Sequence, residues 1–412
     1  MIVGCPKEIK PQEGRVGLLP FGVAELVRNK HTVLIQKNAG LAAGATDEQY
    51  RAAGAQIVEN AEEIYARSDL IVKSCAFFDL CCDNVLPPPT VWPPRKAIEN
   101  RAVHKVKEPL PCEFVHIRSG QVVFTYFHFP SDRQLTEAML QCEAVCIAYD
   151  TVEDSHGRLP LLEPMSEVAG RLAVQEGMHF LSYHKGGKGV LLGGVPGVSH
   201  GKVLVIGGGV VGLNAAKTAA GVGATVVILD KNLERLRFID DILPRNCTTR
   251  YSSEVALMEE LPTADLVIGA VLLPGRLTPK VLRRVHLQQM KRGSVIVDVA
   301  VDNGGCCETS RPTSHDDPTY TVDGILHYSV ANMPGAVPVT ATAALTSATL
   351  PHILQLANLG WKDACAQSAP LLKGLTIAQG KVLHRGVAET FNLTLFSFNE
   401  LTPEHSVPVI DA

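Results

Sequence analysis

The chain has 412 residues, enough for two or three domains with full hydrophobic cores. Its 46% hydrophobic and 19% charged residues and its formal net charge of −4 are those of an ordinary globular protein, and no basic stripe indicates a nucleic-acid partner. No apolar run reaches the roughly eighteen residues of a membrane span, and the first ten residues carry charges where a secretory signal would be apolar. We therefore expect a cytoplasmic protein with no nucleic-acid or membrane partner, whose eleven cysteines are reduced thiols.

The first 160 residues alternate between strand-like and helix-like segments. Apolar runs predict strands at 2–4, 32–36, 69–72, 121–126 and 144–148. Helical patterns occur at 23–29, 47–53 and 132–141. This order of strands and helices predicts a first α/β domain with a parallel sheet.

The segment 74–105 interrupts this pattern. It contains five prolines, three cysteines, two phenylalanines and Trp92, and it has neither strand nor helix periodicity. Structureless loops of this length are uncommon inside compact domains. We interpret the segment as an insertion of uncertain structure, which is either a genuine loop or translated non-coding sequence from an erroneous gene model.

A glycine-rich turn between two apolar strands is the most informative feature of the sequence. The run 203–206 predicts a buried strand that leads directly into Gly207, Gly209 and Gly212 and then into an alanine-rich helix, and a second strand ends at Asp230, eighteen residues past the last glycine. This is the pattern of a dinucleotide-binding turn, in which glycines let the backbone approach a pyrophosphate and the acid binds ribose hydroxyls. A carboxylate repels the 2′-phosphate of NADP, so Asp230 favours NAD. The alternative is a glycine turn that serves packing alone.

The remaining segments complete two α/β domains. A helix is expected at 166–183, and strands at 266–271, 295–299 and 325–330 would complete a doubly wound sheet around the glycine turn. A helix at 340–360 leads into the closing residues, which are too few for a separate domain and are expected to pack on the first one. The predicted fold is therefore α/β with two doubly wound Rossmann-like domains. The nucleotide domain, 161–338, is inserted into a discontinuous substrate domain, 1–160 and 339–412.

Four polar residues outside the glycine turn follow predicted strands, where ligands bind in open α/β sheets. They are Arg15, Lys107, His128 and Asp302, with Lys107 at a strand end once the insertion is set aside. This set of two cations, an imidazole and a carboxylate suits a 2-oxo or 2-amino acid as substrate. An arginine can bind a carboxylate through two hydrogen bonds, and a histidine can transfer a proton at the carbonyl carbon. Each residue also has a structural interpretation, as a surface charge, a strand-end histidine or a turn residue.

Several motifs together resemble NAD-dependent alanine dehydrogenases. They are, in chain order, PKEIKPQEGRVGLLPFGVAEL, VKEPLP, FTYFHF, PLLEPMSEVAGRLA, GGVPGV, VIGGGVVGLNAAK, DLVIGAVLLPG, VIVDVAVDNGGC, SRPT and VANMPGAVP. The resemblance extends nearly from end to end and needs few gaps apart from the insertion. It implies the same two-domain fold, a homohexamer, and the reversible oxidative deamination of L-alanine to pyruvate and ammonia with hydride transfer to NAD.

The resemblance also implies roles for residues at matching positions. Arg15 and Lys107 correspond to substrate-binding residues, and His128 and Asp302 to the catalytic acid–base residues. Arg235 stands where a lysine is common in the family, so a cation is kept. The implied cofactor-binding residues are Ser166, Gly207, Gly209, Val210, Val211, Gly212, Asp230, Arg235, Ser252, Val271, Leu272, Val299, Ala300, Val301, Asp302, Arg311, Val330, Ala331, Asn332 and Met333. No metal site is expected, because the histidines show no ligand spacing.

The sequence departs from the family pattern in three places besides the insertion. The family's DQGG is DNGG at 302–305, a common KTST is VTAT at 339–342, and the tail 391–412 matches only loosely. The insertion is the most serious departure, because it splits the strand that leads to Lys107. It could cover the substrate site, alter specificity, or prevent that strand from forming.

Two other functions stay open at this point. The chain could be the NAD-binding component of a proton-translocating transhydrogenase, although Lys107 and His128 would then have no assigned task. It could also be a catalytically impaired NAD-binding homologue whose substrate site the insertion has disabled. Dehydrogenases that act on lysine or saccharopine share the architecture, but the VKEP and FTYFH motifs favour alanine.

Deletion of residues 74–105, which leaves the sequence DLIVKVKEPLP, is expected to give a protein at least as stable as the parent. The reason is that the insertion interrupts the α/β pattern and has no periodicity with which to form a core of its own. The melting temperatures of the two purified proteins provide the comparison. A large fall in melting temperature on deletion would contradict the prediction.

Overall fold

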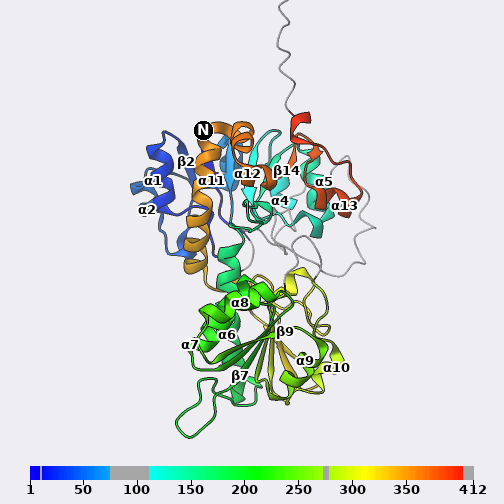
Figure 1. The fold of residues 1–412 in the computed structure, drawn as a ribbon. Coiled ribbons are helices and arrows are strands. Elements are labelled where there is room, and N and C mark those ends of the chain that lie inside the picture. Colours follow the sequence, from blue (N-terminus) through cyan, green and yellow to red (C-terminus); the bar gives the residue numbers. More distant parts are fainter. Residues whose placement is uncertain (10–11, 75–110, 272–277, 402–412) are drawn as a thin grey trace, which may run out of the picture. The chain divides into compact units, whose positions relative to one another are not determined.

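The computed structural model describes residues 1–9, 12–74, 111–271 and 278–401. The chain divides into two compact units, Met1–Leu162 with Pro338–Ala412, and Glu163–Val337. Each unit is an α/β structure built on a mostly parallel sheet (Figure 1), so the expected fold class is confirmed. No helix in the described part of the chain is long and apolar enough to span a membrane.

The sheet of the first unit has the doubly wound order. Its eight described strands lie in the order β15-β14-β6-β5-β4-β1-β2-β3, and the pairs from β6 to β3 are parallel. The winding reverses between β1 and β4, which makes the carboxyl ends of these two strands the expected ligand edge. The strands are β1 Ile2–Cys5, β2 Thr32–Gln36, β3 Gln56–Val58, β4 Leu70–Val72, β5 Val122–Thr125, β6 Val145–Ala148, β14 Leu375–Ala378 and β15 Lys381–Val382.

Several helices of the first unit begin at polar residues that cap them. Thr46 forms a capping box with Gln49 at α2, and the side chains of Asn60 and Asp132 accept backbone N–H bonds at α3 and α5. The long helix α11 leaves helical geometry at Gly360, where φ is 75°, which matches the helix predicted for 340–360. The helices are α1 Pro20–Arg28, α2 Asp47–Ala52, α3 Ala61–Arg67, α4 Pro111–Phe114, α5 Arg133–Gln141, α11 Pro338–Gln367, α12 Ala369–Gly374 and α13 Arg385–Phe391.

The sheet of the second unit repeats this order. Its seven described strands lie in the order β12-β13-β11-β10-β7-β8-β9, with the reversal between β7 and β10 and with only β12 antiparallel to its neighbour. The strands are β7 Lys202–Ile206, β8 Thr225–Asp230, β9 Cys247–Tyr251, β10 Leu266–Gly269, β11 Val295–Asp298, β12 Thr319–Val322 and β13 Ile325–Tyr328. The helices are α6 Glu163–Phe180, α7 Val210–Gly221, α8 Leu233–Ile242, α9 Glu254–Glu260 and α10 Arg284–Leu287.

Alternate residues of β7 enter two separate cores, as the two-residue period of a strand requires. Val203 and Val205 pack among side chains of α6 and α7, whereas Leu204 and Ile206 pack on the other face with side chains of α9. The continuous apolar run of this strand therefore reflects burial on both faces of the sheet.

Some elements differ from the sequence-based expectation. Helix α6 begins at Glu163 instead of Ser166, because Pro164 fits in a first turn, where no N–H bond is needed. Strand β9 was not expected, because its sequence CTTRY is polar and none of its residues is fully buried. Strand β14 pairs antiparallel with β6 and so adds the closing part of the chain to the first sheet.

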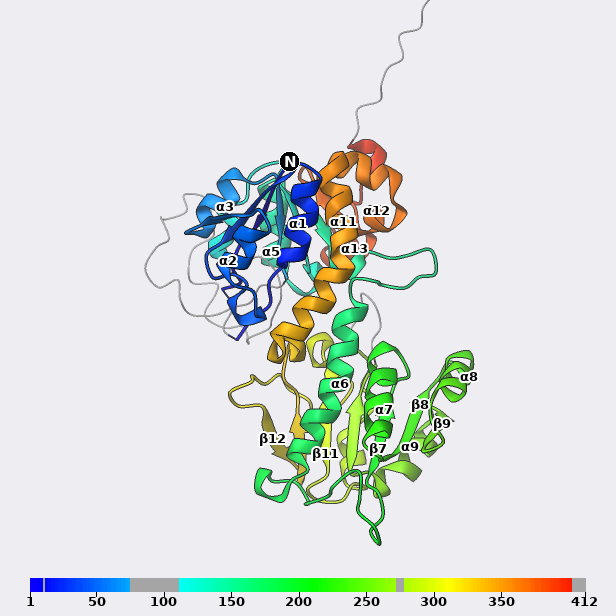
Figure 2. The same cartoon turned by 90° about the vertical axis from the view of Figure 1, so that its left-hand side faces the viewer.

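Helices α6 and α7 lie side by side in close contact (Figure 2). A Cβ atom on Gly170 of α6 would lie only 2.3 Å from the backbone oxygen of Val211, in the first turn of α7. A glycine is therefore required at position 170 for the two backbones to approach this closely. The contact also fixes the start of α7, which follows the glycine turn directly.

Replacement of Gly170 by alanine is expected to lower the free energy of unfolding by about 1–3 kcal/mol, because the helices must separate to admit the methyl group. Gly221, the last residue of α7, is the matched control, since a Cβ atom there would meet nothing within 4 Å. Gly221→Ala is expected to be neutral or to stabilise by up to about 1 kcal/mol. Urea unfolding of both variants measures the difference, and equal effects would show that the α6–α7 contact is not as tight as described.

Candidate functional site

The glycine turn of the second unit has the geometry of an anion-binding turn. Gly207 has φ of 101°, and a Cβ atom on it would lie 2.7 Å from the backbone oxygen of Ala270. A Cβ atom on Gly212 would lie 1.8 Å from the oxygen of Gly207, so these two glycines are required by the backbone path. A Cβ atom on Gly209 would meet nothing within 4 Å, so Gly209 borders open space at the N-terminus of α7. That is where an anionic group is stabilised by free N–H groups and the helix dipole.

Asp230 and Arg235 both contact the glycine turn. The Asp230 carboxylate accepts N–H bonds from Gly208 (2.6 Å) and Asn232 (2.8 Å). The Arg235 guanidinium donates to the backbone oxygens of Gly208 (2.5 Å) and Gly209 (3.2 Å). Burial lowers the pKa of Arg235, and the charge of Asp230 opposes this effect. The acid and the cation are therefore placed together beside the turn.

Asp302 lies on a short 3₁₀ turn, Val299–Asn303, that follows β11. The carboxylate of Asp298 is fully buried and accepts N–H bonds from Ala300 (3.1 Å), Cys306 (3.3 Å) and Cys307 (3.0 Å), so it holds both ends of this loop. A carboxylate oxygen of Asp302 accepts the backbone N–H of Asn332 at 3.2 Å. Asp298 could not be singled out from the sequence, because an aspartate at a strand end is common in turns.

Most of the predicted cofactor-binding residues follow the carboxyl ends of strands in the second unit. Ser252 follows β9, Val271 follows β10, and Arg311 lies in the loop before β12 with its guanidinium 4.3 Å from the centre of the Tyr320 ring. Leu272 lies outside the described residues. Ser166 is on α6, and Val210 and Val211 are in the first turn of α7. The remaining predicted positions follow β11 and β13, namely Val299, Ala300, Val301, Val330, Ala331, Asn332 and Met333.

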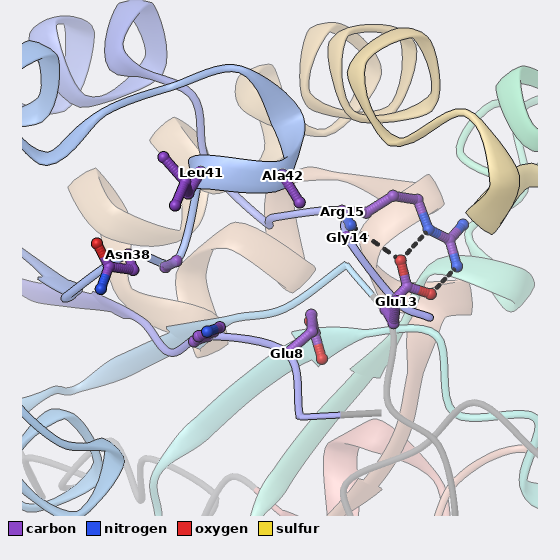
Figure 3. Close-up of a pocket in the computed structure, with 9 residues that line it drawn as sticks. Glu8, Glu13, Gly14, Arg15, Asn38, Leu41 and Ala42 are labelled. Atoms are coloured by element: carbon purple, nitrogen blue, oxygen red, sulfur yellow. Dashed lines mark hydrogen bonds and ion pairs between the residues drawn. The ribbon is translucent and has the colours of Figure 1, made fainter. Parts of the chain in front are cut away.

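A pocket of about 130 Å³ lies at the carboxyl edge of the first sheet, in the part that follows β1 (Figure 3). Arg15 lines this pocket, and its side chain is 2% exposed. The guanidinium donates from Nε and Nη2 to the two carboxylate oxygens of Glu13, at 2.7 and 2.6 Å. The other lining residues are Lys7, Glu8, Gly14, Asn38, Ala39, Leu41 and Ala42.

The segment that carries Arg15 is held in place on both sides. The Val16 N–H donates to the hydroxyl of Thr342 at 3.3 Å, and the Tyr50 hydroxyl donates to the backbone oxygen of Leu18 at 2.7 Å. A Cβ atom on Gly17 would lie 2.7 Å from the oxygen of Val72, so the segment runs against the end of β4. These contacts fix the backbone of the pocket without a contribution from the Arg15 side chain.

Lys73 follows β4 directly and is fully buried between two carboxylates. Its Nζ lies 2.6 Å from Glu113 Oε1 and 3.2 Å from Glu8 Oε2, and the Tyr65 hydroxyl donates to Glu113 at 2.8 Å. Burial alone would lower the pKa of Lys73, but the carboxylates of Glu113 and Glu8 outweigh it and raise the pKa well above its usual value. The Ser74 N–H donates to Glu8 at 2.8 Å. Because Glu8 also lines the pocket of Arg15, the buried lysine supports the wall of that pocket.

His128 follows β5 in the left-handed backbone region, with φ of 48°. A histidine in this conformation is uncommon, and such strain often accompanies function. Its Nδ1 lies 3.8 Å from Asp150 Oδ2, and the other oxygen of Asp150 accepts the N–H of Phe127 at 3.2 Å. The ring stacks on Tyr126, with centroids 5.9 Å apart. Asp150 is therefore a partner of His128 that the sequence-based reasoning missed.

The structure brings together part of the predicted substrate site. Arg15 and His128 follow β1 and β5, which flank β4 in the first sheet, and Lys73 joins them at the end of β4. Lys107 lies outside the described residues, and Asp302 belongs to the second unit. In the sequence, Lys73 stands out only as a charged residue at the end of the apolar run LIVK. Nothing in that run indicates its carboxylate partners.

Replacement of Lys73 by methionine is expected to destabilise the protein by about 3–5 kcal/mol near neutral pH, because two buried carboxylates lose their common cation. Protonation removes one of these unpaired charges, so the folded variant takes up protons and the deficit should shrink as the pH falls. Melting temperatures measured at several pH values test this dependence. Lys37→Met is the control, because Lys37 forms an ion pair with Glu59 in which both side chains are largely exposed. A deficit that does not change with pH would contradict the described network.

The two sheets, the glycine turn and the acid at the end of β8 define a Rossmann-like nucleotide-binding α/β protein with two units. Family models described as "Alanine dehydrogenase/PNT, N-terminal domain" and "Alanine dehydrogenase/PNT, C-terminal domain" match residues 4–76 with 91–169 and residues 173–385. The chain therefore belongs to the alanine dehydrogenase/PNT family, and it is an oxidoreductase of the class that acts on CH–NH₂ groups.

Individual relatives agree with the family models. The chain is 48% identical to an alanine dehydrogenase of Bacillus subtilis, with 94% of each chain covered, and 45% identical to one of Mycolicibacterium smegmatis, with 95% of this chain and 97% of the relative covered. A solved structure of an L-alanine dehydrogenase matches with a TM-score of 0.84 at 45% identity and covers 95% of this chain and 99% of the other. A transhydrogenase from Sinorhizobium meliloti matches with a TM-score of 0.71 at 23% identity, which is a likeness of fold.

Proposed function

We propose that the protein catalyses the reversible oxidative deamination of L-alanine to pyruvate and ammonia with NAD as the hydride acceptor. The observation that carries the proposal is the buried arginine of the first unit. Arg15 lines a pocket at the carboxyl edge of the sheet, in a chain that alanine dehydrogenases match over nearly their whole length. An arginine in such a place suits the carboxylate of a small amino acid.

The second unit has the features that an NAD molecule requires. Open space beside Gly209 at the start of α7 fits a pyrophosphate, and Asp230 at the end of β8 fits the ribose hydroxyls and disfavours a 2′-phosphate. The chemistry that NAD supplies when bound is the acceptance of the alanine α-hydrogen as a hydride. The other predicted cofactor-binding residues, including Arg235 and Arg311, remain proposals for contacts around this turn.

The chain's own residues would then handle the carboxylate and the protons. Arg15 and Lys107 would bind the substrate carboxylate, and Asp302 would stabilise the cationic iminium that forms at the α-carbon. His128 would take a proton from the water that attacks this carbon and return a proton to the departing ammonia. Asp150 beside Nδ1 would hold a proton on that nitrogen, which makes Nε2 the basic nitrogen of the ring.

The proposal also includes a homohexamer in the cytoplasm, as the family resemblance implies. The second candidate is an NAD-binding protein without turnover. One observation favours it. The insertion lies between Lys73, which supports the pocket wall through Glu8, and Lys107, which is the predicted substrate-binding lysine.

His128→Ala is expected to lower alanine-dependent NADH formation by about 10²–10⁴-fold, because the acid–base group is removed. NADH absorbance at alkaline pH with L-alanine and NAD is the measurement, and NADP in place of NAD should give much slower turnover. His156→Ala is a matched control, because His156 also lies 3.9 Å from an aspartate, Asp154, but is 75% exposed. Its activity should equal that of the parent.

The deletion of residues 74–105 separates the two candidate functions in the same assay. Turnover by the parent chain that His128→Ala removes would support the dehydrogenase. Turnover that starts only after the deletion would mean that the insertion disables a competent site. NAD binding without alanine-dependent turnover in either form would leave only the nucleotide-binding function.

A further inference from the structure

Glu13 holds Arg15 with the geometry that arginine also uses to bind substrates. Two parallel bonds join Nε and Nη2 of Arg15 to the carboxylate oxygens of Glu13, at 2.7 and 2.6 Å, and the Arg15 backbone N–H adds a third bond at 3.0 Å (Figure 3). The Glu13 side chain is 0% exposed. A bidentate pair of this kind is strong and directional. Glu13 thus occupies the Nε–Nη2 edge of the guanidinium from within the protein.

Other contacts also hold the loop that carries Arg15. Thr342 and Tyr50 already anchor the backbone at Val16 and Leu18, and the close approach of Gly17 to β4 fixes the segment further. The side chain that Glu13 binds is that of Arg15, which lines the pocket. The Glu13 carboxylate therefore acts on the charge and orientation of the Arg15 side chain, in addition to its bond to the backbone N–H.

Charged side chains of both signs line the pocket. Among the described residues, the charged side chains at the pocket are Lys7 and Arg15 and the carboxylates Glu8 and Glu13. Glu8, Glu13 and Arg15 are buried, so solvent screens their charges only weakly and each one acts on a bound ligand. An acid with one carboxylate places its single negative charge beside the guanidinium of Arg15. An acid with two carboxylates adds another negative charge close to Glu8 and Glu13, and like charges brought together are strongly disfavoured.

We propose that Glu13 is a specificity-determining residue that restricts this pocket to oxo and amino acids with one carboxylate, by offsetting the charge of Arg15 and fixing its guanidinium. The inference rests on the proposed function, because it takes the pocket of Arg15 to be the substrate site. Beyond that function, it states that acids with two carboxylates are excluded and that Glu13 excludes them.

Glu13→Gln tests the proposal, because it removes the charge and keeps the size of the side chain. The values of kcat/KM for pyruvate, 2-oxobutyrate and oxaloacetate are measured with ammonia and NADH. The ratio of oxaloacetate to pyruvate is expected to rise about tenfold or more in Glu13→Gln, as relief of a like-charge contact predicts. The ratio of 2-oxobutyrate to pyruvate, which reports only apolar size, should change by less than about twofold. These ratios do not depend on how much of the variant is folded.

Glu25→Gln is the matched control, because Glu25 pairs with Arg28 at 2.6 Å on the exposed surface of α1. Both ratios should equal those of the parent in this variant. An unchanged oxaloacetate ratio in Glu13→Gln would overturn the proposal. A parallel rise of both ratios would also overturn it, since it would show a loosened pocket and not a charge effect.

A comparison of substrates on the parent protein keeps the proposal testable if Glu13→Gln does not fold. The 4-amide of oxaloacetate has the size of oxaloacetate without the second charge, so the parent should prefer the amide by about tenfold or more. Equal use of the two acids would refute exclusion by charge.

A parent protein that turns over none of these acids would contradict the proposed function. Binding of each acid is then measured as the rise in melting temperature that it causes in the presence of NADH, since a ligand that binds the folded state stabilises it. The predicted order, pyruvate and the amide above oxaloacetate in the parent, is the same, and its absence would overturn the inference independently of turnover.

Discussion

Parallel strand pairing is the constraint on which the arrangement of both units depends. Parallel strands place all their carboxyl ends on one edge of a sheet, and the loops diverge where the winding reverses. In the first sheet this point lies between β1 and β4, which lead to Arg15 and to Lys73. In the second it lies between β7 and β10, which lead to the glycine turn and to Val271. The residues of each site therefore lie at one edge because of the order of the strands, although they are far apart in the sequence.

The charges at these edges are fixed by partners instead of by solvent. Arg15 is paired with Glu13, Lys73 lies between Glu8 and Glu113, and the buried Asp298 accepts three backbone N–H bonds. Buried ion pairs of this kind contribute little net stability, because the cost of desolvation offsets the attraction between the charges. Their value lies in orientation, since a buried charge with fixed partners cannot swing away from a ligand. The first unit thus presents oriented groups at the edge where small acids are expected to bind.

The fold class and the glycine turn could be predicted because they depend on local patterns. The buried strands read as apolar runs, and the turn at Gly207 needs a residue that tolerates φ of 101°. The partners of the site residues could not be predicted in this way. Glu113 is 40 positions from Lys73, and nothing in the sequence near either residue indicates the other. Asp150 was missed for the same reason, and the roles of His128 and Asp302 stay predictions. Pairing across long separations is a property of the folded chain, not of a motif.

The structure limits what the insertion can disturb. Strand β4 is fully formed, pairs with both β1 and β5, and is followed by the buried Lys73, so the insertion does not prevent that strand from forming. Ser74 still donates its N–H and its hydroxyl to Glu8. Glu113, which follows the insertion, binds Lys73, which precedes it, at 2.6 Å. Residues on both sides of the insertion therefore meet in one buried network, as the proposed substrate site requires.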